Sequence, residues 1–266
     1  MKVVILAGGY GTRLSEETHV KPKTMVEIGD MPILWHIMKI YSHYGYNEFI
    51  ICLGYKGNYI KEWFNNYYLH HSDMTIDLEK NKIEFHKSNG EKWKVTLVDT
   101  GDGTMTGGRL KRIKEYIGNN PFMMTYGDGV CDIRVDKLVE YHKSHKADAT
   151  MTTVIPEGRF GTVVINRKNG ITAFSEKTDN KNRVNGGFFV FEPVIFDYIE
   201  GDHTILEREP LETFAREGNI NAYTHDGFWM PMDKLSDKIQ LETMWKENRA
   251  PWKVWDKKSN GKKSGK

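Results

Sequence analysis

A short apolar run near the start of the chain leads directly into a cluster of glycines. Val3-Val4-Ile5-Leu6-Ala7 is followed by Gly8-Gly9-Tyr10-Gly11. A continuous apolar run of this length that ends at glycine is typical of a strand buried on both faces. Three glycines in four positions permit a tight turn and a close approach of the backbone to a ligand. The sequence therefore predicts a buried strand that ends in a ligand-binding loop.

The glycine loop has the chemistry of a phosphate site. Successive backbone N–H groups form a concave nest for phosphate oxygens, and Arg13 adds a planar cation that pairs with them. The loop is not a P-loop, because no Gly-Lys-Ser/Thr follows it. It is also not a dinucleotide-binding GxGxxG loop, because the third glycine is missing. An ordinary glycine turn is the alternative.

Further along the chain, short apolar strands alternate with amphipathic stretches of helical period. The predicted strands are Phe49–Leu53, Val95–Val98 and Phe122–Tyr126, and the predicted helices are Ile33–Tyr44, Asn58–Tyr67, Arg109–Ile117 and Val135–His145. This alternation favours an α/β fold, with a mainly parallel twisted sheet and helices on both faces.

Two Asn-Gly pairs, which are strong signals for hairpin turns, interrupt the alternation. They predict antiparallel pairing of 82–86 with 92–98 around Asn89-Gly90, and of 162–165 with 171–174 around Asn169-Gly170. A strand over Gly187–Phe191 and a helix over Leu235–Trp245 are expected later. The parallel sheet should thus carry antiparallel additions.

The chain of 266 residues is long enough for one large α/β domain. We expect a single domain over residues 1–255, with an insertion at about 68–94. Residues 256–266 are mainly Lys, Ser and Gly without an apolar anchor, which predicts a disordered basic tail.

Composition excludes several classes of protein. The formal net charge is +2, from 38 Lys and Arg against 36 Asp and Glu, which offers no broad basic face to nucleic acid. No apolar run approaches the roughly 18 residues of a membrane helix, and the first run is too short for a signal peptide. Cys52 and Cys131 have no CxxC spacing, so a disulfide scaffold or a zinc–cysteine site is not expected. A reducing cytoplasm fits best.

Two more charged residues stand where a phosphorylated ligand would meet them. Pro22 stiffens the loop that presents Lys23, whose ammonium is expected to reach the same phosphates as Arg13. Asp128 follows the strand Phe122–Tyr126, at the end of the strand where α/β sheets bind ligands. Mg²⁺ prefers one or two such carboxylates together with phosphate oxygens. The alternatives are an exposed lysine and an ordinary Asp-Gly turn.

The segment Thr104–Leu110 joins the third strand to a helix and contains a pair of glycines. We expect the backbone at Gly107 and Gly108 to approach a planar base. Arg109, at the start of the predicted helix, is expected to donate to a base carbonyl or to stack on the base. A solvated arginine at a helix start is the alternative.

Leu6–Leu14 together with Pro22-Lys23 resembles the long signature of the sugar-1-phosphate nucleotidylyltransferases. Many members have proline at the positions of Glu16 and Thr24, but neither difference removes a charged group of the signature. The resemblance implies that Arg13 and Lys23 are catalytic and hold the phosphates of a nucleoside triphosphate. It implies a nucleotide site formed by Leu6, Ala7, Gly8, Gly9, Tyr10, Gly11, Thr12, Arg13, Lys23, Thr104, Gly107, Gly108, Arg109 and Asp128.

The same resemblance implies a Mg²⁺ ion held by Asp128 and Asp233. Asp233 directly follows the segment Gly227–Met232 and is similar to the Asp of the family's late Trp…Asp element. It also stands directly before the helix predicted over Leu235–Trp245, where an Asp often caps the helix N-terminus. Metal ligand and helix cap are thus the two interpretations of Asp233.

Other segments, among them Pro32–Met38, Met105–Leu110 and Pro156–Gly161, look like the glucose-1-phosphate cytidylyltransferases, one branch of that family. They imply direct in-line transfer from CTP to α-D-glucose 1-phosphate, which gives CDP-glucose and pyrophosphate. They further imply a homo-oligomer, a role in lipopolysaccharide O-antigen synthesis, and a sugar-phosphate site formed by Glu176, Lys177, Asn185 and Gly186.

The residues alone leave other functions open. Pattern reasoning does not choose cytosine over uracil or thymine, so UTP or dTTP is an alternative donor. An alternative of another class is a regulatory module that binds a nucleotide without catalysis. A nicotinamide-linked dehydrogenase is a more distant third.

Overall fold

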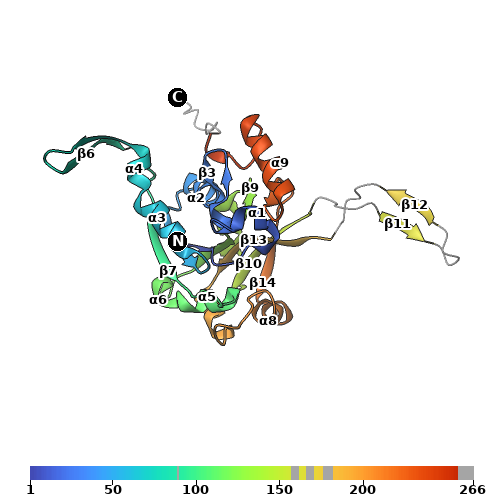
Figure 1. Cartoon of the computed structure of the whole chain (residues 1–266). Helices are drawn as coiled ribbons and strands as arrows, with labels where there is room; N and C mark the ends of the chain where they lie inside the picture. The colour runs from blue at the N-terminus through green and yellow to red at the C-terminus, as the bar shows by residue number, and fades with distance from the viewer. Residues whose placement is uncertain (89, 157–161, 166–170, 176–181, 257–266) are drawn as a thin grey trace, which may run out of the picture.

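A seven-stranded sheet forms the centre of the molecule (Figure 1). The computed structural model describes residues 1–88, 90–156, 162–165, 171–175 and 182–256. The strand order is β14 (Ile220–Thr224), β10 (Ala149–Val154), β13 (Val184–Phe191), β8 (Phe122–Tyr126), β1 (Val3–Leu6), β4 (Glu48–Leu53) and β7 (Lys94–Asp99). Only β13 runs antiparallel to its neighbours within this sheet. The mainly parallel sheet is confirmed.

Successive residues of β1 enter two separate hydrophobic clusters, one on each face of the sheet. Val3 and Ile5 belong to the cluster formed with α2 (Ile33–His43), α3 (Gly57–Asn65), α7 (Val135–Ser144) and α9 (Leu235–Lys246). Val4 and Leu6 belong to the cluster formed with α5 (Thr106–Arg112), α6 (Lys114–Ile117), the short helix η3 (Pro193–Tyr198) and α8 (Glu209–Glu217). Because helices cover both faces, every residue of β1 is apolar and buried.

Two predicted helices differ from the structure. The helix predicted over Asn58–Tyr67 is α3 followed by the short α4 (Tyr67–His71). The prediction of one helix over Arg109–Ile117 is wrong, because α5 begins at Thr106 and a break at Ile113 separates it from α6. Glycine is a poor helix former, yet Gly107 and Gly108 lie in the first turn of α5. Close packing against residues 202–204 accounts for their position in the helix.

The hairpin predicted around Asn89-Gly90 is wrong. β6 (Lys82–Ser88) pairs antiparallel with β5 (Ser72–Asp77), and the turn lies at 78–81. Asn81 has a positive φ of 51° in that turn, a conformation that asparagine tolerates better than most residues. β7 instead pairs in parallel with β4, and Asn89 lies outside the described residues. The β5–β6 hairpin projects from the body of the molecule within the region expected to be an insertion (Figure 1).

A second projecting hairpin consists of β11 (Thr162–Ile165) and β12 (Ile171–Ser175), and its antiparallel pairing is confirmed (Figure 1). Its turn, with Asn169-Gly170, lies outside the described residues, as do 257–266 of the predicted tail. The first residue of that expected tail, Asp256, ends the short helix η4 (Val254–Asp256).

Short elements complete the described fold. The glycine loop leads into η1 (Thr12–Leu14) and α1 (Ser15–Thr18), which are followed by η2 (Lys23–Met25) and the paired strands β2 (Glu27–Ile28) and β3 (Met31–Pro32). β9 (Gly129–Cys131) pairs with β15 (Trp229–Pro231), which joins the segment after β8 to a segment far along the chain. None of the helices in the described ranges is long and apolar enough to span a membrane.

Candidate active site

A cavity of about 610 Å³ opens at the carboxyl ends of β1 and β8. This is the edge where parallel α/β sheets bind ligands, because the loops that follow the strands converge there. The cavity is lined by residues 6–12, Lys23, Thr24, residues 102–106, Arg109, residues 125–129, residues 185–188, Trp229, Pro231 and Asp233. The segments that carry the predicted signature therefore meet at one place.

The glycine loop forms one wall of the cavity, and every residue from Leu6 to Thr12 contributes to it. Gly11 has a positive φ of 63°, and a Cβ atom there would lie 2.8 Å from Cγ2 of Thr18. The Thr18 hydroxyl is placed to donate to the carbonyl of Gly11 (3.2 Å) or of Leu14 (3.0 Å), which fixes the path of the loop into η1. Arg13 lies in η1, but its side chain is outside the described part of the structure.

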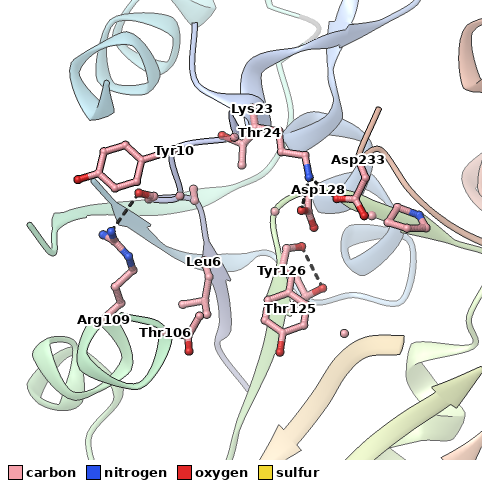
Figure 2. A pocket seen from close by; sticks show the side chains of 18 of the residues that line it. Leu6, Tyr10, Lys23, Thr24, Thr106, Arg109, Thr125, Tyr126, Asp128 and Asp233 are labelled. Atoms are coloured by element: carbon pink, nitrogen blue, oxygen red, sulfur yellow. Dashed lines mark hydrogen bonds and ion pairs between the residues drawn. The ribbon is translucent and has the colours of Figure 1, made fainter. Parts of the chain in front are cut away.

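The guanidinium of Arg109 supports the glycine loop from the side of α5 (Figure 2). Nη2 donates to the carbonyl of Gly8 at 3.0 Å, and Nη1 donates to the carbonyl of Leu53 at 3.0 Å. A Cβ atom on Gly8 would lie 2.1 Å from Nη1, and one on Gly54 would lie 2.5 Å from the same atom. Both glycines are thus required by the close approach of a buried charged group.

The base contacts expected from Gly107 and Gly108 are not supported by this geometry. Their N–H groups both point to the carbonyl of Thr204, at 2.9 and 3.2 Å, and neither glycine lines the cavity. Thr104 and Arg109 do line it. The Nη1 and Nη2 groups of Arg109 also bond the Thr100 hydroxyl and the carbonyls of Gly101 and Asp102, so both groups are committed to the protein in this structure.

Lys23, Asp128 and Asp233 meet in the cavity next to the glycine loop (Figure 2), where a Cβ atom on Gly11 would lie 3.0 Å from Cβ of Lys23. The Nζ atom of Lys23 lies 2.7 Å from Oδ2 of Asp128 and 2.8 Å from Oδ1 of Asp233. Burial by itself lowers the pKa of Lys23, but the two carboxylates raise that pKa above its ordinary value of 10.5. The ammonium therefore remains charged at neutral pH.

The pairing of β9 with β15 brings the two carboxylates together. Gly129 is opposite Pro231, and the N–H of Met232 donates to the carbonyl of Asp128 at 2.8 Å. The N-cap residue of α9 is Lys234 rather than Asp233, and Oδ2 of Asp237 accepts from the N–H groups of both Asp233 and Lys234 at 2.9 Å. This position and the ion pair with Lys23 favour the metal-ligand interpretation of Asp233 over the helix cap.

The predicted metal ligands fit a divalent cation. Asp128 and Asp233 already direct oxygens at one positive group, the ammonium of Lys23. Two carboxylates that converge in this way, next to a loop suited to phosphates, match the preference of Mg²⁺ for carboxylate and phosphate oxygens. The two Asp residues would hold the ion, and Lys23 would then turn to the phosphates.

Asn185 and Gly186 lie on the opposite side of the cavity, within β13 rather than in a turn before it. Nδ2 of Asn185 donates to the Tyr126 hydroxyl at 3.2 Å, and its Oδ1 accepts from the N–H of Gly187 at 2.8 Å. Nε1 of Trp229 donates to the carbonyl of Gly186 at 2.8 Å. Glu176 and Lys177, the other predicted sugar-phosphate ligands, lie outside the described residues.

Sequence reasoning missed several residues of the cavity wall. Tyr126 and Thr106 line the cavity and both donate to Glu207, and Trp229 lines it as well. The position of Tyr126 directly before Gly127-Asp128 was an available signal. Glu207 had none, because its partners are separated from it by 81 and 101 residues.

Comparison with known proteins agrees with this geometry. Residues 2–230 match the sequence model of the nucleotidyl transferase family. The chain is 54% identical over 258 residues to the glucose-1-phosphate cytidylyltransferase of Salmonella typhimurium. The matched region covers 96% of this chain and all of that protein. It is 44% identical over 257 residues to a probable glucose-1-phosphate cytidylyltransferase of Bacillus subtilis, with the same coverage. The crystal structure of HddC from Yersinia pseudotuberculosis has a similar fold, with a TM-score of 0.68 and 24% identity over 92% of this chain and 99% of that one.

Proposed function

The chain belongs to the nucleotidyl transferase family, and from this membership we propose that it transfers the cytidylyl group of CTP to α-D-glucose 1-phosphate. The products are CDP-glucose and pyrophosphate. Identity of 54% over nearly the whole chain to a protein named for this reaction supports the choice of substrates. The observation that carries the proposal is the meeting of Lys23 with Asp128 and Asp233 in one cavity beside the glycine loop.

The triphosphate of the donor is bound by the glycine loop. The backbone from Gly8 to Thr12 lines the cavity, and Gly9 is exposed with open space in front of its Cα. Phosphate oxygens accept from backbone N–H groups of such a loop, and Arg13 supplies the matching charge. Thr104 and Arg109 line the end of the cavity that we assign to the base.

The chemical step needs no strong general base, because the phosphate of the acceptor is anionic at neutral pH. One of its oxygens attacks the α-phosphorus of CTP in line with the leaving group. A new P–O bond forms, the bond from the α-phosphorus to the bridging oxygen breaks, and pyrophosphate leaves with the electron pair. Catalysis then depends on positioning and on neutralisation of negative charge, which Lys23 provides.

Asp128 and Asp233 would hold Mg²⁺, which would supply further neutralisation of phosphate charge. Two of the three N–H donors of the Lys23 ammonium face carboxylates, and the third is the donor that a phosphate oxygen of CTP would accept from. On the acceptor side, Asn185 and Gly186 contact the sugar, and Glu176 with Lys177 completes the sugar-phosphate site.

Initial rates of pyrophosphate release with glucose 1-phosphate and each of CTP, UTP, dTTP and GTP test the donor. We expect turnover with CTP far above the others. Faster turnover with UTP or dTTP would assign another base to the same reaction. Binding of CTP without pyrophosphate release would instead indicate a regulatory module.

We also propose that the enzyme is a homo-oligomer that works in the cytoplasm, where nucleoside triphosphates are available. The projecting β5–β6 hairpin supports self-association, since a two-stranded hairpin alone is marginally stable in water. It exposes Ile76, Leu78, Ile83 and Phe85, with Leu78 88% exposed. Resemblance to the family further suggests a single domain over residues 1–255 and a role in lipopolysaccharide O-antigen synthesis.

Sedimentation measures the association state. Leu78→Asp is expected to shift the enzyme to a smaller species, because it places a charge on the apolar hairpin. Ile239→Asp is the matched control, since Ile239 is also exposed but lies on α9. An unchanged sedimentation coefficient for Leu78→Asp would assign the contact to another surface.

A further inference from the structure

Glu207 lies behind the cavity wall and receives hydrogen bonds from two residues that line the cavity. The Tyr126 hydroxyl donates to Oε1 at 2.5 Å, and the Thr106 hydroxyl donates to Oε2 at 2.6 Å. Glu207 itself does not line the cavity among the described residues. Each carboxylate oxygen is thus committed to a hydroxyl that stands between Glu207 and a ligand.

The carboxylate fixes the direction of a chain of hydrogen bonds. Because a carboxylate only accepts, the proton of the Tyr126 hydroxyl must point toward Glu207. The hydroxyl oxygen is then left to accept, and it accepts from Nδ2 of Asn185 at 3.2 Å. Oδ1 of Asn185 is occupied by the N–H of Gly187 at 2.8 Å. Asn185 lines the cavity, and these two bonds leave the second N–H of its amide as the donor for a ligand.

The surroundings keep this order in place. Tyr126 is largely buried, and this burial is the main reason why the pKa of its hydroxyl is raised. The nearby Glu207 carboxylate raises the pKa further, so the proton stays on the oxygen. Gly187 has a positive φ of 80°, and a Cβ atom there would lie 2.6 Å from Cδ2 of Tyr126. The ring and the β13 backbone are thus in close contact, and the amide of Asn185 is held by its bonds to the Tyr126 hydroxyl and to the N–H of Gly187.

We propose that Glu207 is a positioning residue that, through Tyr126, presents Asn185 as a hydrogen-bond donor to an oxygen of the sugar phosphate. The inference rests on the proposed function and adds a residue that determines acceptor binding from outside the cavity. It predicts that the acceptor must offer an oxygen that accepts a hydrogen bond at this position. Thr106, which accepts from the N–H of Leu206 at 2.9 Å, anchors the second carboxylate oxygen.

The test is a double-mutant cycle with the full-length enzyme. Glu207→Gln keeps the size of the side chain but replaces one acceptor oxygen with a donor NH₂, which opposes the Tyr126 or the Thr106 proton. We expect the KM for glucose 1-phosphate to rise about tenfold, the scale of one hydrogen bond to a charged group. The KM for CTP and the kcat should change much less.

Tyr126→Phe removes the link between Glu207 and Asn185. If Glu207 acts through Tyr126, Glu207→Gln in the Tyr126→Phe background should raise the KM for glucose 1-phosphate by less than twofold. A full tenfold rise in that background, or an equal loss in kcat and in the KM for CTP, would overturn the proposal. Glu209→Gln is the control, because Glu209 is an exposed acid at the start of α8.

Two further measurements keep the outcome clear. Titration calorimetry of glucose 1-phosphate with the wild type and Glu207→Gln reports acceptor binding without turnover, and weaker binding by the variant is expected. Wild-type enzyme that binds glucose 1-phosphate but releases no pyrophosphate from any nucleotide would contradict the proposed function alone. If Glu207→Gln fails to fold, Tyr126→Phe alone must raise the acceptor KM, and an unchanged KM would refute the inference.

Discussion

The Nζ atom of Lys23 lies 2.7 Å from Oδ2 of Asp128, although 105 residues separate the two in the chain. Lys23 reaches this position because η2 begins directly after Pro22, and Asp128 because it follows the buried strand β8. In the protein without ligand, one ammonium thus pairs with two carboxylates, which leaves the three groups with one net negative charge. Binding of a polyanionic donor must redistribute these contacts among lysine, carboxylates and phosphates.

Lys23→Ala should lower kcat by about 10²- to 10³-fold, the cost typical of removing one group that stabilises charge in a transition state. Thermal unfolding should change little by comparison, since the two ion pairs that are lost are only partly buried. The control is Lys39→Ala, because Lys39 forms a similarly buried pair with Glu91 at 2.7 Å outside the cavity. Near wild-type turnover of Lys23→Ala would remove Lys23 from the mechanism.

Asp233→Asn and Asp237→Asn should have opposite consequences, although only three residues separate them. Asp233→Asn weakens the metal site and should reduce turnover and raise the Mg²⁺ concentration needed for half-maximal rate. Asp237→Asn disturbs the cap of α9 and should lower the free energy of unfolding by up to about 1 kcal/mol with turnover retained. Loss of turnover in Asp237→Asn with Asp233→Asn active would reverse the two assignments.

Gly54→Ala should destabilise the fold by about 1–3 kcal/mol, the usual range for overpacking a buried position. Its Cβ atom would lie 2.5 Å from Nη1 of Arg109 and 2.7 Å from the carbonyl oxygen of Gly8. Gly9→Ala is the matched control, because no atom lies within 4 Å of a Cβ there. Urea unfolding of the two variants checks this, and equal stability would show that the guanidinium moves away freely.

His36 predicts an acid-sensitive component of stability. It is fully buried, its Nε2 lies 2.9 Å from the Ile28 carbonyl, and burial lowers its pKa from 6.5 to about 4. Between these values the unfolded chain binds the proton more readily than the folded protein. The stabilisation is complete above pH 6.5 and is lost as the pH falls toward 4, by at most about 1.4 kcal/mol per pH unit.

Urea unfolding at several pH values between 6.5 and 4, for the wild type and His36→Gln, measures this contribution. The variant retains an amide donor but has no titrating group, so its unfolding free energy should depend less steeply on pH in this window. Parallel curves for the two proteins would assign the acid sensitivity to other groups.

The parts of the fold that sequence predicts are those with a local signal. The continuous apolar runs of β1 and β8 and the helical period of α2 need no knowledge of distant residues. The prediction of a hairpin at Asn89-Gly90 was wrong because β7 pairs with β4. This non-local strand pairing outweighs the local preference of an Asn-Gly dipeptide for a hairpin turn. The predicted start of α5 was wrong for a similar reason. The two glycines in its first turn are needed for close packing against residues 202–204, which lie far along the chain.

The same distinction applies to the site. Lys23 and Asp128 stand in local motifs, and the structure brings both to the cavity. Asp233 required resemblance to a family, since its sequence context fits a helix cap equally well. The support that Arg109 gives to the loop and the bonds accepted by Glu207 depend on which carbonyls and hydroxyls converge in space, and no spacing along the chain encodes this.

The arrangement of Gly8, Gly54 and Arg109 has a consequence for how this sequence can diverge. A descendant that gains a methyl group at either glycine meets the guanidinium at once, whereas one that first shortens the arginine removes the clash at Gly8 but keeps the Gly8 carbonyl oxygen 2.7 Å from a Cβ atom on Gly54. Substitutions at these three positions should therefore be epistatic, and their order of appearance in a lineage constrained. Libraries that vary the three codons together would reach functional combinations that single-site scanning discards.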